Sequence, residues 1–148
     1  MIDLQYFPRE LQEAGVDEGN IYFMEKNSSF GVPGHMHVCI KRKDRILFFS
    51  TCSSKIATAQ KLALNKGWDI NTFPVFVADE NTNQFKESQT YVNCNEYYEI
   101  TVTEFVDLQN KGEVRLLLGK FSDSDLALLA NGIKLSTQIP RDIKEMFE

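Results

Sequence analysis

Two runs in the first half of the chain, residues 35–40 and 45–51, show the two-residue periodicity of β-strands. Only the short basic segment 41–45 connects them, so the pattern predicts a β-hairpin. Successive side chains of a strand point to opposite faces of the sheet. In the first run, one face carries His35, His37 and Cys39. The other face carries Met36, Val38 and Ile40; it is apolar, and we expect it to be the core side.

Other strands are predicted from short apolar runs bounded by turn residues, at 19–24, 73–78 and 97–102. Polar, turn-forming residues predict loops at 27–34 and 79–90. Short strands with interposed helices indicate an α+β fold, which we expect to be a small, strongly curved antiparallel sheet with appended helices.

Helices are predicted where apolar residues recur at helical spacing between start and stop signals. The first predicted helix is 8–14, with Pro8 in its first turn, and the second is capped by Ser53 or Ser54 and ends near Gly67. A third begins at the capping box Ser122–Asp125, and a short fourth follows Pro140. The second helix is expected to bury one face, formed by Ile56, Ala59, Gln60, Ala63 and Leu64.

The chain has 148 residues, which suits one domain. We expect an N-terminal helical extension at 1–15 and a barrel domain at 16–148. Hydrophobic residues make up 43%, and no run approaches the ~20 apolar residues that span a bilayer. The N-terminus lacks the pattern of a secretory signal, and the three cysteines include no CxxC pair. These features predict a cytoplasmic protein without a membrane partner.

The net charge of −5 argues against a protein that coats nucleic acid. It does not exclude a nuclease, because a substrate responds to local charge. Four basic residues flank one aspartate at 41–45, whereas the chain from Glu96 onward is rich in acidic residues.

Five short segments carry a recognisable order of residues. They are Gly-Asn-Ile-Tyr-Phe at 19–23, Val-Cys-Ile at 38–40, Phe-Phe-Ser-Thr-Cys-Ser at 48–53, Tyr-Val-Asn-Cys-Asn-Glu at 91–96 and Leu-Gly-Lys-Phe-Ser-Asp-Ser-Asp-Leu at 118–126. In this order they resemble the MazF/PemK-like toxins of bacterial toxin–antitoxin systems. The resemblance implies a compact SH3-like barrel, a homodimer, and a metal-independent endoribonuclease that a protein or RNA antitoxin neutralises.

The chain departs from that family at two places. His35 and Met36 stand where the family has an Arg-Pro pair with a catalytic Arg, and the stretch 53–71 is longer and helical. The resemblance makes an endoribonuclease of single-stranded RNA the leading hypothesis. A catalytically inactive module on the same barrel, which binds a protein or nucleic acid, is the alternative.

Metal-free RNA cleavage needs a base for the ribose 2′-OH, donors to the charged phosphorus-centred transition state, and an acid for the leaving 5′-oxygen. Histidine titrates near neutrality, so His35 is assigned as acid or base, with Thr51 and Ser53 as hydroxyl donors. The proposed RNA- and phosphate-binding residues are Lys55, Arg42, Lys43 and His37, with Tyr22, Phe30 and Tyr91 as stacking candidates.

Each assignment has a structural alternative. His37 fits a hydrogen-bonded structural histidine, and Ser53 fits a helix cap. The basic segment 41–45 fits a solvated hairpin tip.

A zinc enzyme that uses His35, His37, Cys39 and Cys52 is a further hypothesis, but a third histidine is missing and the spacing matches no standard structural site. We expect no metal and no cofactor.

Overall fold

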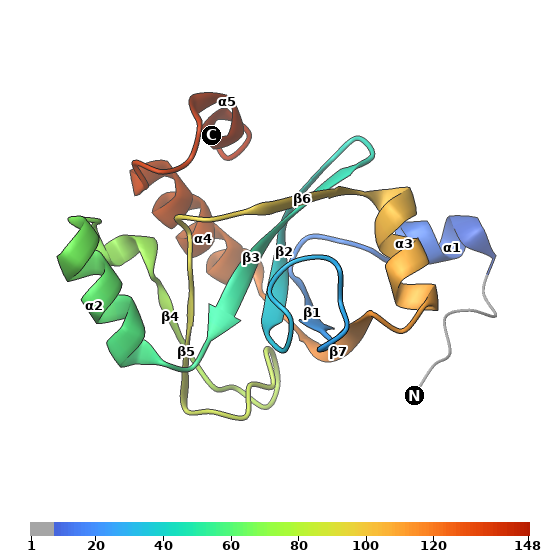
Figure 1. Ribbon diagram of the computed structural model, residues 1–148, viewed down its shortest axis with the longest axis horizontal. Coiled ribbons are helices and arrows are strands. Elements are labelled where there is room, and N and C mark those ends of the chain that lie inside the picture. Colours follow the sequence, from blue (N-terminus) through green and yellow to red (C-terminus); the bar gives the residue numbers. More distant parts are fainter. Residues whose placement is uncertain (1–7) are drawn as a thin grey trace.

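The computed structural model describes residues 8–148. Its strands form one curled antiparallel sheet in the order β4-β5-β3-β2-β1-β7, with β6 also paired to β3 (Figure 1). The strands are β1 (Asn20–Met24), β2 (Met36–Lys43), β3 (Ile46–Ser53), β4 (Val75–Val77), β5 (Gln89–Val92), β6 (Tyr98–Thr101) and β7 (Val114–Lys120). The helices are α1 (Arg9–Ala14), α2 (Ile56–Lys66), α3 (Val102–Asn110), α4 (Asp123–Leu135) and α5 (Arg141–Glu145), and Ile70–Thr72 forms the 3-10 turn η2. The predicted α+β class is confirmed.

The predicted hairpin is confirmed as β2 and β3, which pair from Met36–Cys52 to Lys43–Ile46 with a register shift between Cys39 and Lys41. Asp44 takes the left-handed φ of 56° that the tight turn requires, a conformation that Asp tolerates better than most residues. The register places Thr51 opposite His37. The end of β3 therefore lies beside the start of β2, and this neighbourhood forms the site described below.

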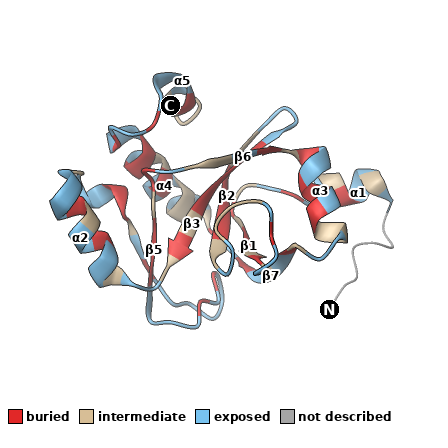
Figure 2. Cartoon of the chain, viewed as in Figure 1, coloured by how far each residue is buried: buried red, intermediate tan, exposed pale blue. Residues whose placement is uncertain are grey.

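Both faces of β2 are buried, so the prediction of a single core face is wrong. Val38 and Ile40 pack with α4 and α5, as expected. Cys39, on the other face, belongs to a second cluster that contains Phe105 from α3. Figure 2 colours parts of both β2 and α3 as buried. The sheet is thus covered by helices on both sides.

Helix α3, which covers the second face, was not predicted. The predicted strand 97–102 ends at Thr101, whose side chain accepts a hydrogen bond from the Glu104 amide at 3.1 Å and caps α3. A Thr followed three residues later by Glu is a helix-start signal, and this pattern at Thr101 and Glu104 is the sequence feature that indicates α3. The predicted loop 79–90 also ends early, because β5 begins at Gln89.

Helix α2 begins one or two residues later than predicted. Its N-cap is Lys55, and the Ser53 hydroxyl instead accepts a hydrogen bond from the Lys55 amide at 3.2 Å. The expected buried face is only partly right: Ala59 and Ala63 are buried, whereas Gln60 is exposed and Leu64 is 82% exposed. The predicted helix end is confirmed by Gly67, which adopts a left-handed φ of 68°.

The helices of the C-terminal part agree with the sequence pattern. Ser122 and Asp125 form the predicted capping box at the start of α4, and α5 follows Pro140. Within residues 8–148, no helix combines the length and apolar character needed to cross a bilayer.

The N-terminal helix α1 is joined to α3. Arg9 pairs with Asp107 at 2.9 Å, and the Asn110 amide donates to Gln12 at 3.0 Å. Residues 1–7 of the predicted extension 1–15 lie outside the described residues.

Candidate functional site

Four of the predicted site residues line one cleft of about 310 Å³: His35, Thr51, Ser53 and Lys55. They come from the loop before β2, from the end of β3 and from the start of α2. The β2–β3 register explains this, because Met36 pairs with Cys52 and brings the preceding residue, His35, to the end of β3. The rest of the lining was not predicted as catalytic: Val32, Thr58, Tyr91, Asn93 and Glu96.

The His35 imidazole is half-buried at the cleft wall. Its Nδ1 lies 3.2 Å from the Pro33 carbonyl oxygen. A carbonyl can only accept, so Nδ1 carries the proton and donates it in this contact when the ring is neutral. Nε2 is then the ring nitrogen that retains a lone pair for proton exchange.

His37 lies beneath the cleft, with none of its surface exposed. Its Nε2 accepts a hydrogen bond from the Val32 amide at 3.0 Å, and its Nδ1 donates to the His35 carbonyl at 3.1 Å. A Cβ added at Gly31 would lie 2.7 Å from Nε2, so the loop backbone sits directly on the ring. The structure therefore places His37 as a support for the loop that carries Val32 and His35.

Burial lowers the pKa of His37 from its ordinary 6.5 to about 4. Protonation at Nε2 would also destroy the acceptor that holds the Val32 amide. Between pH 6.5 and 4 the unfolded chain binds a proton here that the folded protein does not. The contribution of His37 to stability is therefore complete above pH 6.5 and is lost as the pH falls toward 4.

We expect the free energy of unfolding to fall by about 3 kcal/mol between pH 6.5 and pH 4 through this group alone. The measurement is urea unfolding at a series of pH values for wild type and His37→Gln. Glutamine keeps an acceptor for the Val32 amide but does not titrate, so the variant should lose this part of the pH dependence. Parallel pH curves for the two proteins would contradict the assignment.

Thr51 presents its hydroxyl between His37 and the cleft. Its Oγ1 lies 3.5 Å from His37 Nε2, farther than the Val32 amide that already binds that nitrogen. The Thr51 carbonyl accepts from the Asn93 amide at 3.0 Å, which extends the pairing of β3 with β5 and brings Asn93 to the cleft. No local sequence pattern encodes this contact, which explains why Asn93 was missed.

Glu96 brings a carboxylate to the cleft, in the turn between β5 and β6. Burial, and next the charge of Glu96, raise the pKa of the neighbouring Tyr98 hydroxyl. The Tyr98 ring meets His37 edge-on at 5.7 Å. The cleft thus combines an imidazole, a carboxylate, a lysine ammonium and the hydroxyl-bearing residues Thr51, Ser53, Thr58 and Tyr91.

Arg42 and Lys43 lie at the other end of β2, about 25 Å along the strand from His35 and outside the cleft lining. The Arg42 guanidinium donates to the carbonyls of Glu13 and Val16, at 2.6 and 2.7 Å. These bonds satisfy carbonyls at and just beyond the C-terminal end of α1, which lack partners within the helix. Lys43 is exposed at the hairpin tip.

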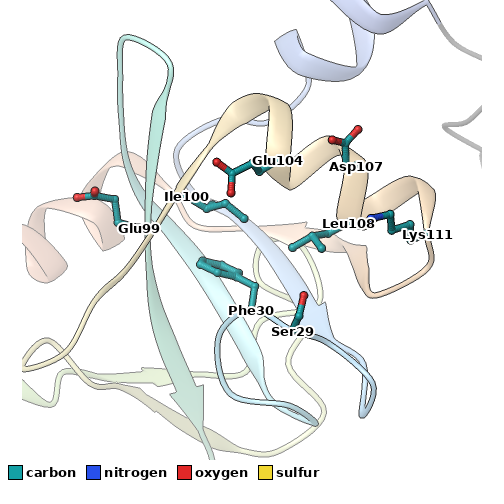
Figure 3. A pocket seen from close by; sticks show the side chains of 8 residues that line it. All are labelled: Ser29, Phe30, Glu99, Ile100, Glu104, Asp107, Leu108 and Lys111. Atoms are coloured by element: carbon teal, nitrogen blue, oxygen red, sulfur yellow. The ribbon is translucent and has the colours of Figure 1, made fainter.

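A second cavity, of about 320 Å³, lies between α3 and the loop before β2. The same loop separates it from the cleft, because Ser29 and Phe30 line the cavity whereas Val32 and His35 line the cleft. Figure 3 shows the carboxylates of Glu99, Glu104 and Asp107 around the cavity, with Lys111 at one end. This arrangement disfavours a phosphate, because like charges repel. Phe30, a predicted stacking residue, lines this cavity.

The other predicted stacking residues are not free for a base. Tyr22 is 1% exposed and meets Phe105 edge-on at 4.9 Å. Tyr91 is buried, although part of it lines the cleft.

The cysteines are buried thiols. Burial raises the pKa of Cys39 and of Cys52 to about 12, so both are protonated at neutral pH and are poor nucleophiles. In the described part of the chain, no group of three or more His, Cys, Asp or Glu side chains is arranged to hold a metal ion.

No protein-family model and no curated protein sequence matches this chain. The evidence for a function therefore lies in the residues of the cleft and in the five segments described above.

Proposed function

We propose that this protein is a metal-independent endoribonuclease that cleaves single-stranded RNA. One observation carries the proposal: His35, Thr51, Ser53 and Lys55, chosen from the sequence for this chemistry, line a single cleft. Its volume of about 310 Å³ falls in the range of small-ligand sites and suits one sugar–phosphate unit.

In the proposed reaction, each cleft residue has a separate role. The ribose 2′-oxygen attacks the adjacent phosphorus and the bond to the 5′-oxygen breaks, which leaves a 2′,3′-cyclic phosphate and a 5′-hydroxyl. One of the two groups, His35 Nε2 or the Glu96 carboxyl, removes the 2′-OH proton, and the other, in its protonated form, donates a proton to the 5′-oxygen. The hydroxyls of Thr51 and Ser53 donate to the non-bridging oxygens as charge develops there.

Lys55 supplies the positive charge that the phosphate requires. It is exposed at the cleft wall and precedes the first turn of α2. Backbone amides at a helix start also favour an anion. In this proposal Lys55 takes the place of the arginine that the MazF/PemK-like toxins carry on another segment.

The wider expectations follow from the same resemblance and belong to the proposal. The curled sheet is an SH3-like barrel, the protein works as a homodimer, and an antitoxin of protein or RNA controls it. The edge strand β7 carries two exposed leucines, Leu116 and Leu118, that a partner would cover.

The test is incubation of the purified protein with an end-labelled RNA of mixed sequence in EDTA. We expect cleavage that leaves 2′,3′-cyclic phosphate and 5′-hydroxyl ends, because the 2′-OH is the nucleophile. The same sequence with 2′-deoxyribose at the cleaved position should resist. Absence of cleavage, or equal cleavage of the deoxy substrate, would contradict the mechanism.

An inactive binding module stays the second candidate, because His35 stands where the family has its catalytic Arg. It predicts RNA or protein binding in the cleft without any strand scission. The EDTA assay, run beside a binding measurement on the same RNA, separates the two.

A further inference from the structure

Helix α2 and its flanks carry only positive charge. Residues 54–68 contain three lysines and no aspartate or glutamate, although the whole chain carries −5. This stretch lies within the segment 53–71, which sets the chain apart from the MazF/PemK-like pattern. None of the proposed chemistry uses α2 beyond its first turn.

The helix begins in the cleft and leads away from it. Lys55, its N-cap, and Thr58, in its first turn, both line the cleft. Residues three and four apart are neighbours on a helix surface, so Lys61 and then Asn65 continue the row that starts at Thr58. The row Thr58–Lys61–Asn65 extends about 10 Å along the helix.

The lysine of this row is free for an external partner. Lys61 is exposed, and within residues 8–148 neither Lys61 nor Lys55 takes part in an ion pair. Lys66, in contrast, lies over the Trp68 ring, 5.9 Å from its centre. Ala59 and Ala63 fix the orientation of the helix, because they are its buried residues.

We propose that the row Thr58–Lys61–Asn65 on α2 binds the phosphate backbone of the RNA strand beside the cleaved phosphate. This inference rests on the proposed function, since it needs RNA in the cleft. A strand whose scissile phosphate lies next to Lys55 has its neighbouring phosphates within reach of the adjacent helix surface. Lys61 neutralises one of them, and Thr58 and Asn65 supply neutral hydrogen-bond donors.

The charge of the rest of the molecule also favours an RNA strand that leaves the cleft along α2. The opposite end of the molecule carries α3 and the cavity lined by Glu99, Glu104 and Asp107, which would repel phosphates (Figures 1 and 3). An acidic protein would also suit the exposed Lys61. RNA fits better because the row starts inside the cleft that holds the proposed cleavage residues.

The experiment measures the affinity of two RNAs whose 2′-hydroxyls are all methylated, so that neither is cleaved. One is a trinucleotide that fills only the cleft, and the other is a dodecamer that also reaches α2. Wild type, Lys61→Gln, Lys61→Glu and the control Lys111→Glu are compared by fluorescence anisotropy at several salt concentrations. Lys111 is an exposed lysine at the end of α3, at the opposite end of the molecule.

We expect Lys61→Glu to weaken dodecamer binding about ten-fold and to leave trinucleotide binding within two-fold of wild type. Lys61→Gln should reduce the slope of log affinity against log salt by about 0.7, the value for one phosphate contact on a single strand. Lys111→Glu should match wild type.

The outcomes separate this inference from the proposed function. Unchanged dodecamer affinity in Lys61→Glu, in a protein whose wild type cleaves RNA, overturns the inference and leaves the function standing. Equal loss for both RNA lengths also overturns it, because the effect is then not confined to α2. If Lys61→Glu leaves dodecamer affinity unchanged but abolishes the binding of poly-L-glutamate, the row serves an acidic protein instead. A wild type that binds neither RNA and cleaves none overturns both.

Discussion

Replacing His35 by alanine is expected to slow RNA cleavage by about 10²- to 10⁴-fold, the usual loss when a proton-transfer group is removed. The cleft should otherwise persist, because His35 is half-buried and its side-chain contact, from Nδ1 to the Pro33 carbonyl, lies within its own loop. The loop keeps its attachment through the Val32 amide and His37. The measurement is the single-turnover rate on a labelled RNA in EDTA.

Ser54→Ala is the matched control for the His35 variant. Ser54 is exposed and adjoins two cleft residues, but it does not line the cleft. Its cleavage rate should equal that of wild type. If His35→Ala also cleaves at the wild-type rate while remaining folded, the acid–base role of His35 is refuted and any activity has another source.

Replacing Phe105 by alanine is expected to lower the free energy of unfolding by about 3–5 kcal/mol, the range for emptying a buried aromatic site. Phe105 has no exposed surface and stacks on Phe49 with ring centres 4.8 Å apart. It also meets Tyr22 edge-on at 4.9 Å, so its loss leaves a cavity between α3 and the sheet. Urea unfolding followed by circular dichroism measures the change.

Leu118→Ala is the control for the Phe105 variant. Leu118 is 92% exposed on the edge strand β7, so its removal should change stability by no more than about 0.5 kcal/mol. A loss below 1 kcal/mol for Phe105→Ala would show that α3 contributes little to the second core.

Local sequence patterns predicted an element correctly where the residues that interact to form it lie within a few positions of one another. The hairpin of β2 and β3 followed from two alternating runs with a short connection. The start of α4 followed from a capping box, whose hydrogen bonds join only Ser122 and Asp125. Backbone sterics and short-range hydrogen bonds act the same way wherever they occur in a chain.

The sequence was misleading where burial depends on a distant element. The face of β2 with His37 and Cys39 was not the face expected to meet the core, yet α3 covers it from about 60 residues further along the chain. His37 therefore supports a loop from inside the protein. Arg42 looked available for RNA, but it binds the backbone at the end of α1.

The sequence by itself determined the α+β class, the hairpin and the choice of His35, Thr51, Ser53 and Lys55. Only the tertiary structure decided that these four share a cleft, that Glu96 and Asn93 join them, and that the basic hairpin tip lies outside it. The reason is physical. Residue type and local hydrogen bonding are set by neighbours in the chain, whereas a cleft is formed by segments that the sheet register and long-range packing bring together.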